Sequence, residues 1–226
     1  MDLLRGMAVI AMVFFHLIFD LTYFDLSSLE LSGIYWRVYA VFWASLFFFI
    51  VGICLTISYN RATKKLNKKG LLRKFSLRGI KILGLGLIIS LITYFVFPRM
   101  YIVFGALHFI GFSIIAGSFL LIFFDDRIIR IFGLPLSILI ILIGFLLSKI
   151  NLPHNWLTWL GITPRGFVSL DYFPIFPWFA SVSFGLWFGT IFYHKGRRRI
   201  NLPEIGNFKS ILSLGRHSLP IYLFHQ

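Results

Sequence analysis

Residues 3–20 read Leu-Leu-Arg-Gly-Met-Ala-Val-Ile-Ala-Met-Val-Phe-Phe-His-Leu-Ile-Phe-Asp, an apolar stretch that carries three ionisable side chains. Its apolar run, which continues to about residue 24, predicts a helix across a membrane, because about 20 apolar residues span the ~30 Å hydrocarbon layer. Arg5 and His16 are eleven residues apart, which places them within about 20° on a helix and roughly 16 Å apart along it. Asp20 follows four residues later on the same face, within reach of the imidazole. The stretch predicts a transmembrane helix whose one face carries a cation, a histidine and a carboxylate.

The whole chain has the composition of a membrane protein that crosses the bilayer several times. Hydrophobic residues make up 58% of its 226 residues, charged residues only 13%, and the mean hydropathy is +0.87, well outside the range of soluble domains. We predict an all-α polytopic transmembrane bundle that forms a single domain over residues 1–226. The predicted spans are 3–24, 36–59, 78–98, 104–124, 131–150 and 173–193.

A seventh span is predicted to begin near residue 217. Ten residues remain from there to Gln226, about 15 Å of helix, which cannot cross the hydrocarbon layer. We therefore expect six complete spans and a truncated seventh, with the natural protein continuing beyond Gln226.

Lys and Arg are distributed by side of the membrane. With a cytoplasmic N-terminus, 18 of the 22 lie on the cytoplasmic side, and the outer side holds Arg37, Arg99, Lys149 and Arg165. This asymmetry predicts that orientation. It also explains the net charge of +14 without a nucleic-acid partner, and it makes membrane lipids with anionic headgroups the expected neighbours. We expect a multi-pass protein of the cell membrane, plasma or inner.

Ionisable groups within spans need a reason, since each costs roughly 2.5–3.5 kcal/mol at a helix centre. His16 and Asp20 are such a pair, and we expect the carboxylate to orient the imidazole. The alternatives are a pair that serves packing alone, an Asp20 that reaches the membrane surface, and an Arg5 that is an ordinary anchor at the inner end.

His108 is a second histidine within a span, and Gly105 and Gly111 share its helical face. Glycines let a neighbouring helix or a ligand approach closely. By topology His108 enters from the outer side, as Asp20 does, so we expect the two to meet in one outward-facing cavity. The alternative for His108 is a buried ring bonded to a backbone carbonyl.

The outer loop at 150–172 and the start of the sixth span supply candidate substrate-binding residues, Arg165 and Asp171. Asp171 precedes an early proline, which is also the pattern of a helix N-cap. Cys54, the lone cysteine, gives no thiol-based metal site, and sequences typical of zinc sites, phosphate loops and nucleophile elbows are absent, so we expect no metal.

These residues favour chemistry across the bilayer. A donor that carries phosphates would bind from the inside near Arg5, while His16 acts as a general base or as a transient acyl acceptor for a substrate on the far side. Asp20 and His108 complete the predicted catalytic set.

The chain resembles the heparan-α-glucosaminide N-acetyltransferase catalytic-domain family in its short prokaryotic form, over nearly its whole length. The Arg-x10-His spacing is also similar to that of membrane acyltransferases that O-acetylate cell-surface glycans. The resemblance implies transfer of an acetyl group from cytoplasmic acetyl-CoA to an amino sugar or glycan hydroxyl outside, with Arg5 on the CoA side and His16 as catalytic histidine. The segments that carry it are residues 2–6 with His16 and Asp20, residues 107–111, residues 171–178 and residues 215–222.

Two other hypotheses stay open at this point. In a transporter or lipid-linked-sugar carrier, His16, Asp20 and His108 would relay protons or bind a polar solute. A purely structural membrane subunit would leave the His–Asp pair unexplained. The sequence also leaves open whether the protein forms a homo-oligomer.

Overall fold

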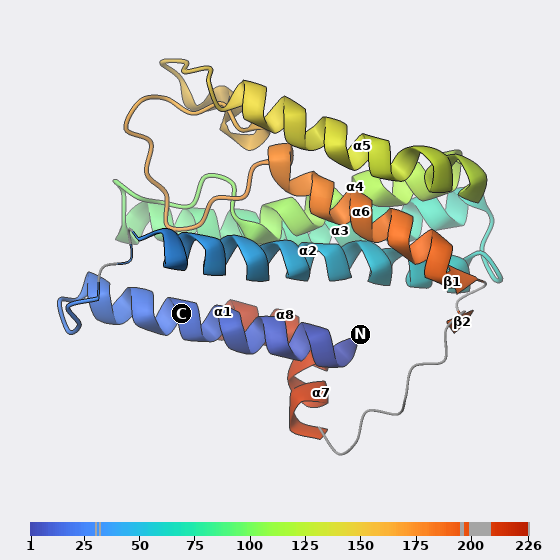
Figure 1. Cartoon of the computed structure of the whole chain (residues 1–226), viewed down its shortest axis with the longest axis horizontal. Coiled ribbons are helices and arrows are strands. Elements are labelled where there is room, and N and C mark those ends of the chain that lie inside the picture. Colours follow the sequence, from blue (N-terminus) through green and yellow to red (C-terminus); the bar gives the residue numbers. More distant parts are fainter. Residues whose placement is uncertain (30, 32, 195–196, 199–208, 226) are drawn as a thin grey trace. The chain divides into compact units, whose positions relative to one another are not determined.

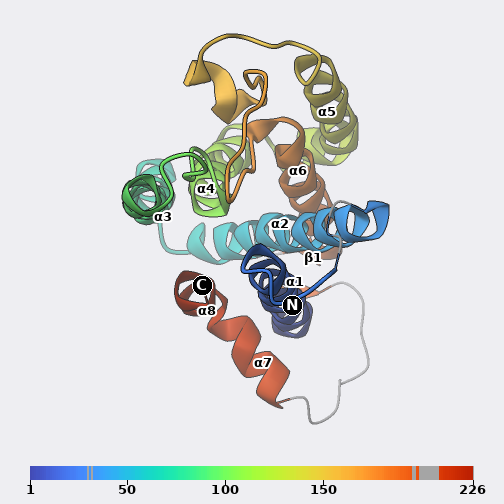
Figure 2. The same cartoon turned by 90° about the vertical axis from the view of Figure 1, so that its left-hand side faces the viewer.

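The computed structural model describes residues 1–29, 31, 33–194, 197–198 and 209–225. The chain folds as two compact units, one of residues 1–50 with 201–226 and the other of residues 51–200. Figures 1 and 2 label the elements of both units in two views.

Six helices are long and apolar enough to cross a membrane, as predicted: α1 (Asp2–Tyr23), α2 (Ile34–Ala62), α3 (Lys68–Val96), α4 (Ala106–Phe123), α5 (Asp126–Leu147) and α6 (Ile175–Phe192). Shorter elements are the 3₁₀ helix η1 (Asn155–Leu160), the helices α7 (Lys209–Arg216) and α8 (Ser218–Phe224), and two-residue strands β1 (Tyr193–His194) and β2 (Arg197–Arg198), which pair antiparallel. The all-α polytopic architecture is confirmed.

The helix boundaries differ from the predicted spans by up to five residues, except at the start of α3. Helix α3 begins ten residues before the predicted span, because Asn67 caps it by accepting a hydrogen bond from the Gly70 N–H at 2.9 Å. Lys, Leu and Arg favour helix, so the helix continues where the apolar span stops. The C-terminal helix predicted from residue 217 is preceded by a separate helix, α7, and the chain turns at His217 into α8.

The unit of residues 51–200 is built from two helix pairs, α3 with α4 and α5 with α6, which lie side by side in both views. Helix α4 is the most enclosed, with 67% of its apolar span buried, against 17% for α3 and 22% for α5. The exposed faces of α3 and α5 carry large apolar side chains such as Leu91, Phe95 and Phe145, each about 60% exposed or more. Such faces suit lipid rather than water.

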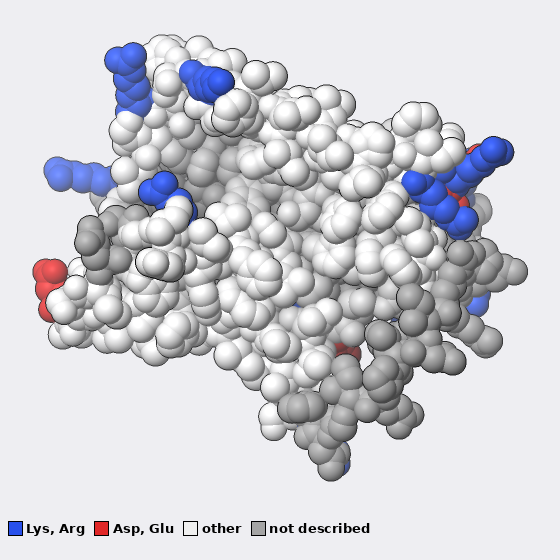
Figure 3. Space-filling model, viewed as in Figure 1, with Lys and Arg blue, Asp and Glu red and all other residues white. Residues whose placement is uncertain are grey.

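The charged side chains also fit a position of α5 across a membrane. On the face of the molecule in Figure 3, Lys and Arg lie near the two ends of α5, and the surface between them is uncharged. A charge-free band flanked by basic ends is the arrangement of a bilayer-spanning helix.

Glycines allow the helices of this unit to approach closely. A Cβ added to Gly79 on α3 would lie 2.7 Å from the Gly111 carbonyl oxygen on α4, and a Cβ on Gly111 would lie 2.8 Å from the Gly79 carbonyl oxygen. On the second half of α2, Gly52 faces Gly185 of α6 in the same way. Gly185 and Gly189 form a small-residue motif, and Gly189 packs against Thr56.

The unit of residues 1–50 and 201–226 is organised around α1. Its first turn packs against α7, where Gly6 lies against Ile211 and Gly215 lies against the Asp2 carbonyl. Further along α1, the Tyr39 hydroxyl of α2 donates to the Ala11 carbonyl at 3.0 Å, and the Phe15 and Tyr39 rings stack. Helix α1 therefore contacts both the first half of α2 and the C-terminal helices.

Replacing Gly79 by alanine should destabilise the α3–α4 pair, because the new methyl group would lie 2.5 Å from an Ile115 carbon and 2.7 Å from the Gly111 carbonyl oxygen. We expect a loss of about 1–3 kcal/mol, typical of an overpacked core. Thermal unfolding of the purified protein in detergent measures it.

Gly84 is the matched control on the same helix, because a Cβ there would meet nothing within 4 Å. Gly84→Ala should leave stability unchanged or raise it by about 0.5–1 kcal/mol. Equal destabilisation by both substitutions would contradict the close approach at Gly79.

Candidate active site

His16 lies on α1 and contacts the last described residue of the chain. Its Nδ1 is 2.9 Å from the Met12 carbonyl oxygen of its own helix and 3.1 Å from Nε2 of His225. The two imidazole rings have centroids 4.7 Å apart and planes 67° apart. Both rings are half-buried. The structure thus pairs two histidines that are 209 residues apart in the sequence.

The partners of the two rings assign their protons. A bond to a carbonyl oxygen requires an N–H, so Nδ1 of His16 is protonated toward Met12, and Nδ1 of His225 is protonated toward the Tyr222 carbonyl at 2.8 Å. In this tautomer, with both rings neutral, His225 Nε2 carries a lone pair and shares the single Nδ1–H of His16 with the Met12 carbonyl oxygen. His16 Nε2 is then also unprotonated, as a general base or nucleophile must be.

Asp20 does not take the place that the sequence predicted for it. Among the described residues, His16 bonds to Met12 and His225. No hydrogen bond joins Asp20 to His16 in the part of the chain that the structure describes, where Met12 and His225 engage Nδ1 of the ring. The catalytic role of Asp20 stays a prediction.

Arg5 contacts α7. Its Nη1 donates to the Gly215 carbonyl at 3.1 Å and lies 3.4 Å from an Asp2 carboxylate oxygen, and Asp2 also lies 3.6 Å from Nε of Arg216. Arg5 and His16 thus both face the C-terminal helices, as expected for residues on one side of α1. The side chain of Arg5 is 23% exposed, and that of Arg216 is 68% exposed, so this end of α1 presents cations to solvent.

His108 lies in the other unit, at the start of α4, and is 5% exposed. Its Nδ1 accepts from the Gly105 N–H at 3.3 Å, so Nε2 carries the proton and donates to the Ser90 hydroxyl at 3.4 Å. Gly86 of α3 makes room for the ring, since a Cβ there would lie 3.0 Å from it. The partner is thus a backbone N–H and not the carbonyl of the sequence-based alternative. The predicted meeting of His108 with Asp20 stays a prediction.

Asp171 lies beside His108 at the same helix end. Its carboxylate accepts from the Ala106 N–H at 2.7 Å, and Gly105, which has no side chain, packs against it. The predicted alternative, a cap on the sixth span, is wrong, because Asp171 caps α4 and the N-cap of α6 is Pro174. Asp171 therefore links the loop of residues 150–172 to the connection that leads into α4, both of which the sequence predicts to lie on the outer side.

These connections are also joined through the backbone. The Leu170 N–H donates to the Met100 carbonyl at 2.8 Å, and the Phe173 N–H donates to the Phe104 carbonyl at 2.9 Å. Tyr172 donates to the Thr158 carbonyl at 2.7 Å, and burial raises the pKa of Tyr172 to about 12, so the donor stays protonated through the physiological range.

Arg165 is exposed in a turn of the same loop, next to Gly166, whose φ of +74° favours glycine. It does not contact Asp171 among the hydrogen bonds and ion pairs of the described residues. The structure thus brings His108 and Asp171 together in the unit of residues 51–200. In the other unit it pairs His16 with His225 and places Arg5 against α7.

Sequence reasoning missed two partners, His225 and Ser90. Placing a histidine in the apolar segment of residues 219–225 costs free energy in a membrane. This cost could have indicated that His225 has a polar partner. Ser90 carried no signal, because serine is common where membrane helices pack.

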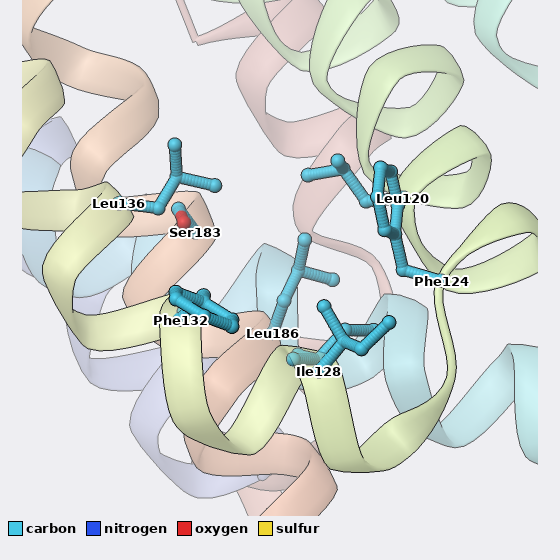
Figure 4. A pocket seen from close by; sticks show the side chains of 9 residues that line it. Leu120, Phe124, Ile128, Phe132, Leu136, Ser183 and Leu186 are labelled. Atoms are coloured by element: carbon cyan, nitrogen blue, oxygen red, sulfur yellow. The ribbon is translucent and has the colours of Figure 1, made fainter.

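A pocket of about 150 Å³ lies between α4, α5 and α6. Figure 4 shows Leu120 and Phe124 across the pocket from Leu136 and Ser183, with Ile128, Phe132 and Leu186 between them. The walls are almost entirely apolar, so the pocket offers no charged group for catalysis. No group of three His, Cys, Asp or Glu suited to a metal occurs in the ranges that the structure describes.

Six apolar helices, a half-buried His–His pair and a basic helix end define a multi-pass membrane protein with a candidate base inside a helical unit. A family model described as heparan-alpha-glucosaminide N-acetyltransferase, catalytic, matches residues 1–226. The chain belongs to this family of membrane acetyltransferases, which favours an enzyme over a carrier or a structural subunit. Comparison with curated proteins and with solved structures finds no match.

Replacing Asp171 by alanine should destabilise the start of α4, because the Ala106 N–H loses its acceptor. We expect a loss of about 0.5–2 kcal/mol, typical of a helix cap, seen as a lower unfolding temperature. Asp171→Asn keeps an oxygen acceptor and should unfold close to wild type. If the asparagine variant is as unstable as the alanine variant, the carboxylate acts through its charge rather than as a cap.

Proposed function

We propose that the protein transfers an acetyl group from cytoplasmic acetyl-CoA to an amino sugar or glycan hydroxyl on the outer side of the membrane, with His16 as the base. The observation that carries this proposal is the hydrogen bonding of His16, whose Nδ1 lies 2.9 Å from the Met12 carbonyl oxygen and 3.1 Å from Nε2 of His225. A proton on Nδ1 leaves Nε2 with a lone pair. Membership of the acetyltransferase family supports the class of reaction.

The proposed orientation places the N-terminus and Arg5 in the cytoplasm. It rests on the distribution of Lys and Arg along the sequence, which concentrates them in the predicted cytoplasmic segments, mainly residues 61–81 and 195–216. The donor CoA carries phosphates that pair well with guanidinium groups. Arg5 and the more exposed Arg216, at the same end of α1, are the proposed donor-binding cations.

The proposed reaction balances without a metal. The acceptor amine or hydroxyl attacks the thioester carbonyl carbon as His16 Nε2 takes its proton, the C–S bond breaks, and the thiolate leaves with the proton from His16. Direct attack by Nε2 on the thioester, with a transient acetyl-histidine, uses the same lone pair.

The acceptor is proposed to enter from the outer side, where the topology puts the start of α4 and the loop of residues 150–172. Asp171 and the exposed Arg165 are the proposed acceptor-binding residues, and His108 supports them by holding Gly105 and Ser90. A cell-envelope sugar or lipid-linked glycan in the plasma or inner membrane is the proposed acceptor class.

His16→Ala should abolish transfer of radiolabelled acetyl from acetyl-CoA to glucosamine by the purified protein, because the base is lost; a fall of about 10²-fold or more is the size of general base catalysis. His154→Ala, at an exposed loop histidine, is the matched control and should keep wild-type turnover. Wild-type turnover in a folded His16→Ala protein would remove His16 from the mechanism.

Arg5→Ala should raise the KM for acetyl-CoA about tenfold or more, as expected for one lost hydrogen bond to a charged group, and leave the KM for glucosamine unchanged. Asp2→Asn is the control for packing, because it removes the ion pairs to Arg5 and Arg216 and keeps both cations. Equal changes in the two KM values of Arg5→Ala would argue against a donor-side role.

A further inference from the structure

His225 is a residue whose role the proposed function does not yet include. It follows α8, and its ring meets the ring of His16 through one short contact, 3.1 Å from its Nε2 to Nδ1 of His16. The Tyr222 ring lies beside it at a centroid distance of 5.7 Å. A histidine in an apolar segment carries a desolvation cost, which this hydrogen bond offsets.

The direction of the bond is fixed by the other partners. Tyr222 accepts from Nδ1 of His225, so the nitrogen that faces His16 is the one with the lone pair. His16 therefore shares its single Nδ1–H between two acceptors, the Met12 carbonyl oxygen at 2.9 Å and Nε2 of His225 at 3.1 Å, and its own Nε2 is left without a proton. The same arrangement of a base, an oriented proton and a fixed acceptor occurs in hydrolase triads, where a carboxylate is the acceptor.

We propose that His225 is a positioning residue that orients His16 and stabilises the positive charge formed when His16 takes a proton from the acceptor. This inference rests on the proposed function. In the reaction, Nε2 of His16 gains the proton of the attacking amine, and the Nδ1–H bond to His225 strengthens because its donor is then charged. The proton leaves with the CoA thiolate, and both rings return to their neutral forms.

A neutral acceptor suits this environment better than a carboxylate. An ionised Asp or Glu in contact with a neutral histidine in the bilayer would be a buried charge without a counterion. His225 provides a lone pair at no charge, and two carbonyl oxygens, those of Met12 and Tyr222, fix the protons of the two rings.

The helices α7 and α8 hold His225 in place. Gly6 and Gly215 let α7 pack directly on the first turn of α1, and Arg5 bonds the last turn of α7 through the Gly215 carbonyl. After the turn at His217, α8 follows α1 as far as His16. The end of α1 that carries Arg5 therefore sets the position of His225.

Kinetics of two variants test this role. His225→Leu removes the acceptor and should lower kcat about 10- to 100-fold, as for the loss of a hydrogen bond to a charged group, with the KM for acetyl-CoA within about twofold of wild type. His225→Gln offers an amide oxygen to His16 Nδ1 and should recover most of kcat. His217→Leu, at an exposed histidine whose ring bonds the Ser213 carbonyl of its own turn, is the control and should keep the wild-type kcat.

NMR can test the hydrogen bond between His16 and His225 independently of enzymatic activity. In protein with ¹⁵N-labelled histidine, a coupling across the N–H···N bond should join Nδ1 of His16 to Nε2 of His225, and His225→Leu should abolish it. An active wild type with no coupling, or a His225→Leu protein with wild-type kcat, would overturn the role of His225. A coupling in a wild-type protein that transfers no acetyl group would uphold the bond and overturn the proposed reaction instead.

Discussion

Direct contact between helix backbones is the constraint on which both units depend. Lipid tails are as apolar as leucine, so burial of apolar area does not by itself bring membrane helices together, and close van der Waals contact at small residues does. Gly79 with Gly111, Gly52 with Gly185, and Gly6 with Gly215 supply this contact within their units. Polar side chains of the candidate site lie next to such contacts: His108 packs on Gly86, and Arg5 bonds the carbonyl of Gly215.

His108 and His16, the two histidines predicted to be catalytic, differ in how many of their ring nitrogens form hydrogen bonds in the structure. Both ring nitrogens of His108 are engaged, one by a backbone N–H and one by a hydroxyl, so this ring fastens α4 to α3. His16 is engaged at Nδ1, which makes it the better candidate for proton transfer.

Much of the fold could be predicted from the sequence, because hydropathy and length identify membrane helices directly. The helical period also placed Arg5 and His16 on one face. The start of α3 could not be predicted in this way, since the helix continues through residues 68–81 where hydropathy falls. Local spacing suggested Asp20 as the partner of His16 and α6 as the helix capped by Asp171. In the structure the hydrogen-bond partners are His225 for His16 and Ala106 for Asp171. Both come from distant segments, and a single sequence gives no measure of such contacts.

The pairing of His16 with His225 also fixes when the site can form. The first helix leaves the ribosome and enters the membrane long before the segment that carries His225, because 209 residues separate the two rings. During this interval Nδ1 of His16 has only its own helix as partner. Contacts between distant segments form late in folding because closing a long loop costs entropy. The His16 site is therefore complete only when α7 and α8 pack on α1. A chain that has inserted its first helices but has not yet packed this segment lacks the His16–His225 pair.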